Sequence, residues 1–304
     1  MVAAGTAIML AVTGCLTPLT PPTPRPRLTP VPSPAHPLVG VFEPDAPNSW
    51  SDVAEFTTAT GVQPRIVLYY SLWNDPFNAS YAQEAWAHNA YVLVQLDPSH
   101  VSLASIVAGD SDAYLRSYAD AVVGFGHPVI LSFGHEMNGT WYTWGYGHES
   151  PATFVAAWRH VVRVFRAAGA ANVTWLWTVN SIAGASSALS LWWPGAAWVD
   201  WTGIDAYYVR PTDTFGYLFG STIADIRTFS SAPLLIAETA VGTTSDRESQ
   251  IDALFAGVSA NSLAGVVWFD EAQHAGLYHQ DWRLEDDPAA LAAFTAGANS
   301  LSGG

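Results

Sequence analysis

VILSFGHEMNGTWYTWG, residues 129–145, is the stretch that decides the predicted fold. It opens as an apolar run without alternation, which is typical of a parallel strand covered on both faces. Its second half carries His135 and Glu136, followed by Trp141, Tyr142 and Trp144. A carboxylate at the carboxyl end of a buried strand, next to indole and phenol rings, indicates a site where a proton donor meets the flat face of a sugar.

From Leu38 onward, strand-like runs alternate with helical stretches. The eight predicted strands are Leu38–Phe42, Arg65–Tyr70, Tyr91–Leu96, Val129–Phe133, Val173–Thr178, Val199–Asp205, Leu234–Glu238 and Leu263–Phe269. The predicted helices between them include Ser49–Thr60, Asp112–Phe125, Pro151–Ala168, Arg247–Ser259 and Pro288–Asn299. This alternation predicts an α/β fold, a single (β/α)8 TIM barrel, over an open doubly wound sheet. No Gly-rich phosphate fingerprint follows the first strand, which counts against a dinucleotide fold.

The composition fits a compact domain. Half of the residues are hydrophobic and only 12% are charged, which excludes an extended disordered chain. The net charge of −15 argues against nucleic acid as a partner, because no basic patch can neutralise phosphates. The 14 Trp residues favour an uncharged polysaccharide as the partner, with packing in the barrel as the alternative for about half of them.

Three segments divide the chain. Residues 1–15 end in Val-Thr-Gly-Cys, which resembles a bacterial lipobox and predicts a signal peptide with Cys15 as the lipidated first residue of the mature protein. An ordinary secretory signal and a cytosolic protein are the alternatives. Residues 16–37 form a Pro/Thr-rich linker with polyproline character, and residues 38–304 form the catalytic domain. We expect an extracellular protein held on the outer face of the cell membrane through Cys15, or otherwise secreted, and no internal disulfide.

Functional groups of a TIM barrel gather at the carboxyl ends of its strands. The residues at these predicted ends are Glu43, Asp45, Trp73, Asp97, His100, His135, Glu136, Asn180, Asp205, Tyr207, Glu238, Trp268 and Asp270.

Two glutamates stand out because each closes a strongly apolar strand. Glu136 ends LSFGHE and Glu238 ends LLIAE. A buried glutamate is unfavourable unless it is paired, protonated or used, so the two make a candidate acid/base and nucleophile pair. Across the barrel they could reach the separation of about 5–5.5 Å of a retaining glycosidase. Alternatively, one of them pairs with an arginine such as Arg65 or faces solvent.

Three blocks carry a family resemblance. HEMNGTWYTWG (135–145), IDAYY (204–208) and LIAETAVG (235–242) resemble glycoside hydrolase family 26, in a clan of (β/α)8 retaining enzymes. The resemblance covers about Leu38 to Ser300. It implies that Glu136 is the general acid/base and Glu238 the nucleophile.

The resemblance also implies the substrate-binding residues. His135 matches a histidine that lines the cleavage subsite, and Trp141 matches a tryptophan beside the scissile bond. Asp205 and Tyr207 match an Asp-x-Tyr pair near the nucleophile, whose tyrosine hydrogen-bonds that carboxylate. Trp268 resembles the aromatic platform under the distorted sugar, whereas Trp73 is a candidate from its position alone.

The expected function is therefore a retaining, endo-acting β-glycoside hydrolase on β-1,4-mannan. The alternatives are a β-1,3/1,4-glucanase (lichenase), a β-1,3-xylanase of the same family, or a non-catalytic polysaccharide-binding lipoprotein. We expect a monomer with no cofactor and no metal, because no second histidine at suitable spacing completes a metal site. Its membrane contact would be only through the lipid anchor.

Overall fold

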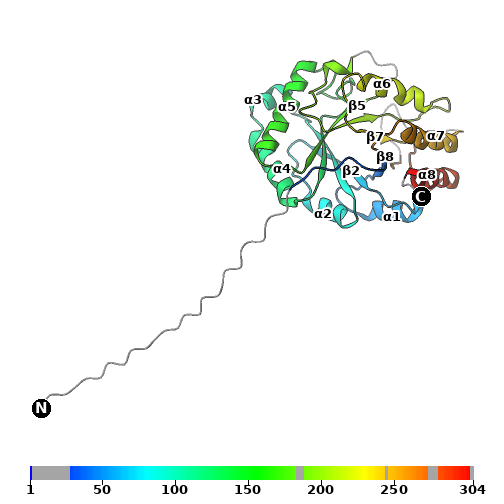
Figure 1. The fold of residues 1–304 in the computed structure, drawn as a ribbon, viewed down its shortest axis with the longest axis horizontal. Coiled ribbons are helices and arrows are strands. Elements are labelled where there is room, and N and C mark those ends of the chain that lie inside the picture. The colour runs from blue at the N-terminus through cyan, green and yellow to red at the C-terminus, as the bar shows by residue number, and fades with distance from the viewer. Residues whose placement is uncertain (2–27, 183–187, 244–245, 273–279, 302–304) are drawn as a thin grey trace.

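The computed structural model describes residue 1 and residues 28–182, 188–243, 246–272 and 280–301 of the 304-residue chain. Within these residues, parallel strands close into a barrel in sequence order, with β8 paired to β1 (Figure 1). They are β1 (Leu38–Phe42), β2 (Ile66–Leu72), β3 (Tyr91–Asp97), β4 (Val129–Phe133), β5 (Val173–Asn180), β6 (Trp201–Asp205), β7 (Leu234–Thr239) and β8 (Gly265–Phe269). Each overlaps a predicted strand, so the prediction of a (β/α)8 barrel is confirmed.

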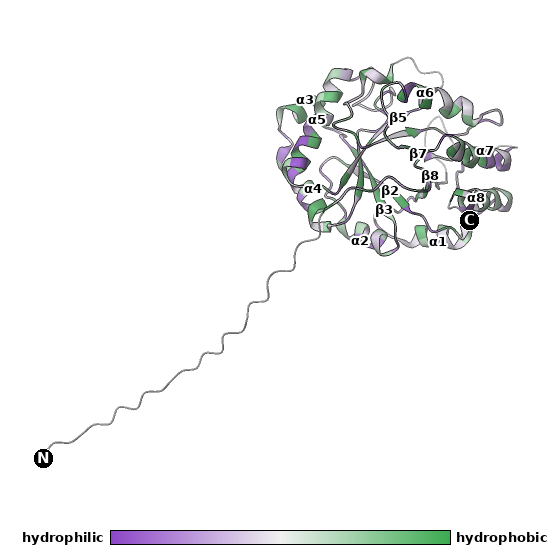
Figure 2. Cartoon of the chain, in the orientation of Figure 1, coloured by the Kyte–Doolittle hydropathy of each residue, from purple (hydrophilic) through white to green (hydrophobic). Residues whose placement is uncertain are grey.

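The strands are covered on both sides. Every residue of β4, β6, β7 and β8 is buried, which explains why these segments show no polar alternation. Because successive side chains of a strand point to opposite faces, alternate residues fill the barrel and the others contact the surrounding helices. Figure 2 shows the hydrophobic strands at the centre and helices of mixed hydropathy around them.

The described helices are α1 (Ser51–Thr60), α2 (Ala79–Ala87), α3 (Leu103–Ala108), α4 (Asp112–Phe125), α5 (Pro151–Ala167), α6 (Ser221–Ile226), α7 (Arg247–Ala260) and α8 (Pro288–Leu301). α5 shows how the sequence starts a helix: the Ser150 hydroxyl accepts the Thr153 N–H at 3.0 Å, and Pro151 occupies the first turn. The sequence analysis did not predict α2, α3 and α6, because six to nine residues give too few turns for a clear helical period.

The barrel begins to make contacts before Leu38. Val31 is buried in the core cluster, and its backbone N–H donates to the Thr174 hydroxyl on β5 at 2.8 Å. Val31, which lies in the predicted linker, therefore packs against the barrel. Cys15 and the predicted signal segment lie outside the described residues.

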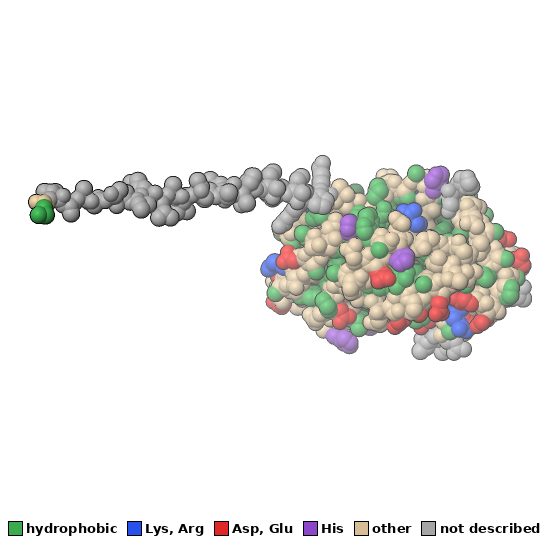
Figure 3. All heavy atoms as spheres, turned by 90° about the horizontal axis from the view of Figure 1, so that it is seen from below, with side chains coloured by type: hydrophobic (Ala, Val, Ile, Leu, Met, Phe, Trp, Pro, Cys, Tyr) green, Lys and Arg blue, Asp and Glu red, His purple; other side chains and the backbone are tan. Residues whose placement is uncertain are grey.

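The surface is acidic. Asp and Glu side chains lie at many points of the face drawn in Figure 3, in keeping with the net charge of −15. Among the described helices, none has both the length and the apolar character that a membrane span needs.

Candidate active site

A cavity of about 920 Å³ opens at the carboxyl ends of the strands. Glu136 and Glu238 both line it, so the structure brings the two predicted carboxylates to one site. The other described residues that line it are Tyr70, Trp141, Tyr142, Asn180, Ser181, Ala206, Tyr207, Val209, Arg210, Asp213, Tyr217, Leu218, Phe269, Gln280 and Trp282.

Glu136 sits on a turn that directly follows β4. Gly134 and Glu136 both adopt positive φ angles, 57° and 53°. A side chain at position 134 would also press on Trp144 and Phe154, since an added Cβ would lie 3.2 and 3.3 Å from their rings. A left-handed backbone is uncommon for a glutamate, and such conformations cluster at functional sites.

The carboxylate of Glu136 has two hydrogen-bond donors. The Trp141 indole N–H donates to Oε2 at 2.7 Å, and the Asn180 side-chain amide donates to Oε1 at 2.6 Å. Burial raises the pKa of Glu136 to about 7; the charge of His135 opposes this shift and that of Glu238 adds to it. Glu136 can therefore hold a proton near neutral pH, as a general acid must.

Glu238 lies within β7 and has three donors. The Tyr70 hydroxyl (2.7 Å) and the Gln95 amide (3.3 Å) donate to its Oε1, and the Tyr207 hydroxyl donates to its Oε2 at 2.9 Å. Burial and the charge of Glu238 raise the pKa of both tyrosines well above the usual value, so both hydroxyls stay protonated. The three donors hold both carboxylate oxygens of Glu238 in fixed positions, as a positioned nucleophile requires.

His135 lies behind the cavity wall. It is 1% exposed and is not among the residues that line the cavity, and its predicted place at the cleavage subsite stays a prediction. Its Nδ1 is 2.8 Å from Asp97 Oδ1, and its Nε2 is 3.1 Å from the Tyr142 hydroxyl. Burial alone would lower the pKa of His135, but the Asp97 carboxylate outweighs burial and the pKa rises to about 9. His135 therefore supports Tyr142, which does line the cavity.

The two tryptophans that follow Glu136 have different environments. Trp141 is 55% exposed and lines the cavity, although its ring packs closely on Gly139. Trp144 is buried and stacks on Tyr142 with ring centres 4.3 Å apart, and its indole N–H donates to the His135 carbonyl. One tryptophan is thus available to a ligand, and the other stabilises the turn.

Asp205 is completely buried behind the nucleophile. It pairs in register with Glu238 across β6 and β7, where the register shifts, but it does not line the cavity. Burial and the neighbouring Glu238 raise the pKa of Asp205 well above the usual value. The predicted role of Asp205 in contacting substrate stays a prediction, whereas Tyr207 lines the cavity.

Trp268 and Trp73 do not line the cavity either. Trp268 is completely buried; its N–H donates to the Trp282 carbonyl at 3.1 Å, and its ring packs on Phe294 of α8. Side chains alternate along a strand, so Phe269, one residue on, points into the cavity instead. Trp73 packs on Tyr114 and Phe133, with ring centres 5.0 and 6.0 Å away. The predicted contacts of Trp268 and Trp73 with substrate stay predictions, whereas Phe269 and Trp282 line the cavity.

The sequence analysis assigned no role to Tyr70 and Gln95, which donate to Glu238, or to Phe269 and Trp282, which line the cavity. Gln95 carried a usable signal, because it is a polar residue inside the apolar run YVLVQLD. Tyr70 lies inside β2 and gives no comparable signal.

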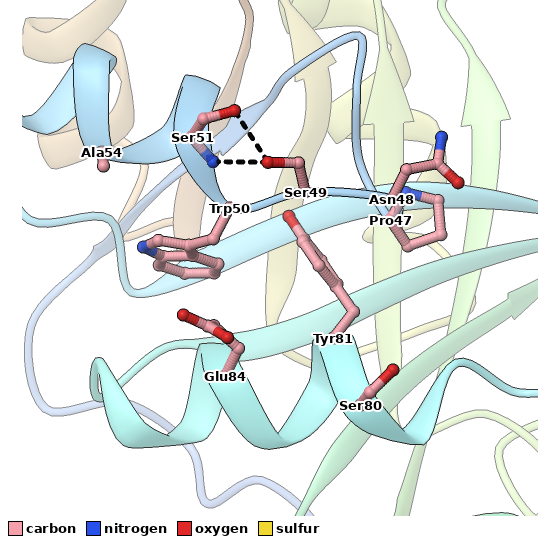
Figure 4. Close-up of a pocket in the computed structure, with 9 residues that line it drawn as sticks. All are labelled: Pro47, Asn48, Ser49, Trp50, Ser51, Ala54, Ser80, Tyr81 and Glu84. Carbon is pink, nitrogen blue, oxygen red and sulfur yellow. Dashed lines mark hydrogen bonds between the residues drawn. The ribbon is translucent and has the colours of Figure 1, made fainter.

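A second, smaller hollow of about 440 Å³ lies between the loop after β1 and α2 (Figure 4). It is lined by Pro47, Asn48, Ser49, Trp50, Ser51, Ala54, Ser80, Tyr81 and Glu84, and it contains neither glutamate of the pair. Among the residues that the structure describes, no group of three or more His, Cys, Asp or Glu is arranged to hold a metal ion.

The chain is similar to several known proteins. The model of glycosyl hydrolase family 26 matches residues 108–253, which contain Glu136 and Glu238. Endoglucanase H of Acetivibrio thermocellus is 29% identical over 264 residues, which cover 81% of this chain and 29% of that protein. A mannan endo-1,4-β-mannosidase of Bacillus subtilis is 26% identical over 168 residues, which cover 52% and 44% of the two chains. The chain thus spans less than half the length of these relatives.

The solved structures agree on the fold. The catalytic domain of a family 26 endo-β-1,4-mannanase from Bacillus sp. JAMB-750 superposes with a TM-score of 0.69 at 16% identity. The match covers 88% of this chain and 86% of that one.

Proposed function

Because the chain belongs to glycosyl hydrolase family 26, we propose that it is an endo-acting β-glycanase that cleaves with retention of the anomeric configuration. The observation that carries the proposal is the contrast between two glutamates of one cavity. Burial gives Glu136 a pKa of about 7, whereas three donors surround the Glu238 carboxylate. A single site can supply both an acid and a nucleophile when its two carboxyl groups have different environments.

The first step forms a covalent intermediate. Glu238 attacks the anomeric carbon while Glu136 gives its proton to the glycosidic oxygen, so the bond to the leaving sugar breaks as the ester bond forms. As negative charge leaves the Glu238 carboxylate, the hydroxyls of Tyr70 and Tyr207 hold its oxygens in place.

The second step reverses the roles. Glu136, now ionised, takes a proton from water, and the resulting hydroxide attacks the same carbon and frees Glu238. The donors Trp141 and Asn180 stabilise the ionised form of Glu136 at this stage. Two displacements at one carbon return the original configuration.

We propose β-1,4-mannan as the backbone. The similarity to the mannosidase of Bacillus subtilis supports this choice. A β-glucan is the second candidate, because endoglucanase H matches a larger part of the chain. The cavity of about 920 Å³, which is lined by aromatic residues as well as by both glutamates, supports cleavage within the polymer.

The test is the release of reducing sugar from β-mannan, glucomannan, mixed-linkage β-glucan and β-1,3-xylan. Glu238→Ala should abolish activity, and Glu55→Ala, which removes an exposed glutamate of α1, should not. Activity on a mannan would identify mannan as the substrate. Activity on the mixed-linkage β-glucan alone would identify the glucan as the substrate instead. A wild-type protein that cleaves none of these polymers refutes the proposal.

We also propose that Cys15 anchors the protein on the outer face of the cell membrane, because residues 12–15 resemble a lipobox. Mass spectrometry of the mature N-terminus tests this. A diacylglycerol mass on Cys15 is expected, and an unmodified N-terminus elsewhere would refute the anchor.

A further inference from the structure

The ring of Tyr217 lines the cavity but is not part of the packed core. It lies on the π-helix η2 (Gly216–Gly220) between β6 and α6, lines the cavity and is 51% exposed. The next two residues, Leu218 and Phe219, are 7% and 0% exposed. These neighbours fix the turn in the core, so the Tyr217 ring is left for something outside the protein. Single-turn π-helices are frequent at functional sites.

The backbone that carries Tyr217 is held in place. Its N–H donates to the Thr214 hydroxyl at 3.1 Å, and Phe215 packs on Phe219 with ring centres 5.1 Å apart. The Ser181 hydroxyl donates to the Leu218 carbonyl from the end of β5. A ring on a fixed backbone binds a ligand with little loss of conformational entropy.

This turn belongs to the same side of the cavity as the acid. Asn180 donates to Glu136, its neighbour Ser181 donates to Leu218, and Leu218 adjoins Tyr217. The donors to Glu238 are Tyr70 and Gln95 on β2 and β3, together with Tyr207 after β6. Because the acid protonates the leaving oxygen, the leaving part of the chain lies on the side of Tyr217.

Arg210 lies on the same wall and is fixed through its backbone. Asp213 Oδ2 accepts the N–H groups of Val209 and Arg210 at 2.9 and 2.8 Å, and Gln250 donates to the Arg210 carbonyl at 2.8 Å. Among the described residues that line the cavity, Arg210 is the basic one. Its guanidinium offers up to five N–H donors, which suit the hydroxyl oxygens of a neutral sugar.

We propose that Tyr217 and Arg210 form a distal subsite on the leaving side, which binds a neutral β-linked pyranose one unit beyond the sugar next to Trp141. This inference rests on the proposed function and adds a determinant of chain length and cleavage position. The sugar stacks on Tyr217 while Arg210 donates to its hydroxyls. The subsite fixes where along the polymer the carboxylates cut.

The test uses a series of oligosaccharides, from three to six units, of the polymer that the wild type cleaves. In Tyr217→Ala, kcat/KM should fall about three- to tenfold for chains long enough to reach the subsite and stay unchanged for the shortest ones. Hydrolysis in ¹⁸O-labelled water, read by mass spectrometry, should show cleavage shifting by one unit toward the end that leaves. Arg210→Gln should act in the same direction, and Tyr217→Phe should keep most of the activity.

Tyr146→Ala is the matched control, because Tyr146 is 41% exposed and does not line the cavity. If Tyr217→Ala and Tyr146→Ala give the same chain-length dependence and the same cleavage positions, the subsite is refuted while the proposed function stands. A wild type that is inactive on every glycan refutes the proposed function itself.

Discussion

The hydroxyl of Tyr70 on β2 donates to Oε1 of Glu238 on β7 across 2.7 Å. The two residues are 168 positions apart in the chain, and the closed barrel brings them together. The contact places a protonated phenol against a carboxylate oxygen of the proposed nucleophile, so it connects a residue with no predicted functional role to the proposed chemistry.

Tyr70→Phe should therefore reduce kcat/KM by about ten- to a hundredfold, because a hydrogen bond to a charged group contributes about 1.5–3 kcal/mol. Tyr69→Phe is the matched control. Tyr69 is the preceding residue of β2, and its ring packs on Tyr81, away from the cavity. Equal losses in the two variants, measured on one substrate, would show that Tyr70 has no specific role.

The activity should decline as the pH rises through about 7, because Glu136 must be protonated to act as the acid. Asn180 stabilises the ionised form and so holds the pKa of Glu136 down. Asn180→Ala should shift the alkaline limb of the kcat/KM profile upward, by about one pH unit or less. Asn48→Ala, in the hollow of Figure 4, should leave the limb in place. An unmoved limb in Asn180→Ala would refute the assignment of this limb to Glu136.

Stability should fall at alkaline pH in a way that depends on Asp97. The pKa of His135 rises from 6.5 to about 9 in the folded protein, mainly because the Asp97 carboxylate outweighs burial. The folded state thus binds this proton more tightly than the unfolded chain does. The resulting stability, at most about 3 kcal/mol, is fully present below pH 6.5 and is lost as the pH rises through 9.

Denaturant unfolding between pH 6 and 9.5 measures this effect. Asp97→Asn should reduce stability at pH 6 and flatten the slope between pH 6.5 and 9. Glu136, Asp270 and Glu43, whose pKa values burial raises to about 7, 8 and 10, also contribute to the slope and leave a residual slope in both proteins. Identical slopes in the wild type and in Asp97→Asn would contradict the role of the pair.

Alanine substitutions of Trp268 and Trp141 should have opposite effects on stability and on activity. Trp268→Ala should lower the free energy of unfolding by about 3–5 kcal/mol, because it empties a site in the core. Trp141→Ala should leave stability nearly unchanged and reduce kcat/KM, since Trp141 is exposed and donates to Glu136. Thermal unfolding and kinetics on both variants test this prediction. A large kinetic defect in a folded Trp268→Ala variant would contradict it and support a role of Trp268 as a platform under the sugar.

The barrel was predictable because its strands are nearly uninterrupted apolar runs, and the glutamates because they interrupt the ends of such runs. The aromatic residues that line the cavity were not predictable in this way. Trp268 and Phe269 are adjacent and both aromatic, and only the register of β8 decides which one faces the cavity. Trp282 lies in the loop after β8, and its position depends on tertiary contacts such as its packing on Tyr207 at 5.1 Å. Similarly, the hydrogen bond of Tyr70 to Glu238 joins two strands that are remote in sequence, so the sequence alone does not reveal it.

The most direct measurement is to trap the covalent intermediate with an activated 2-deoxy-2-fluoroglycoside of the polymer's sugar and to map the label by peptide mass spectrometry. Glu136→Gln, which keeps the size of the side chain but cannot transfer a proton, should still accept the label, because the activated leaving group needs no protonation. Accumulation of one sugar on Glu238 is the predicted result. A label on another residue, or a product that NMR shows to be inverted, would contradict the assignment of Glu238 as the nucleophile.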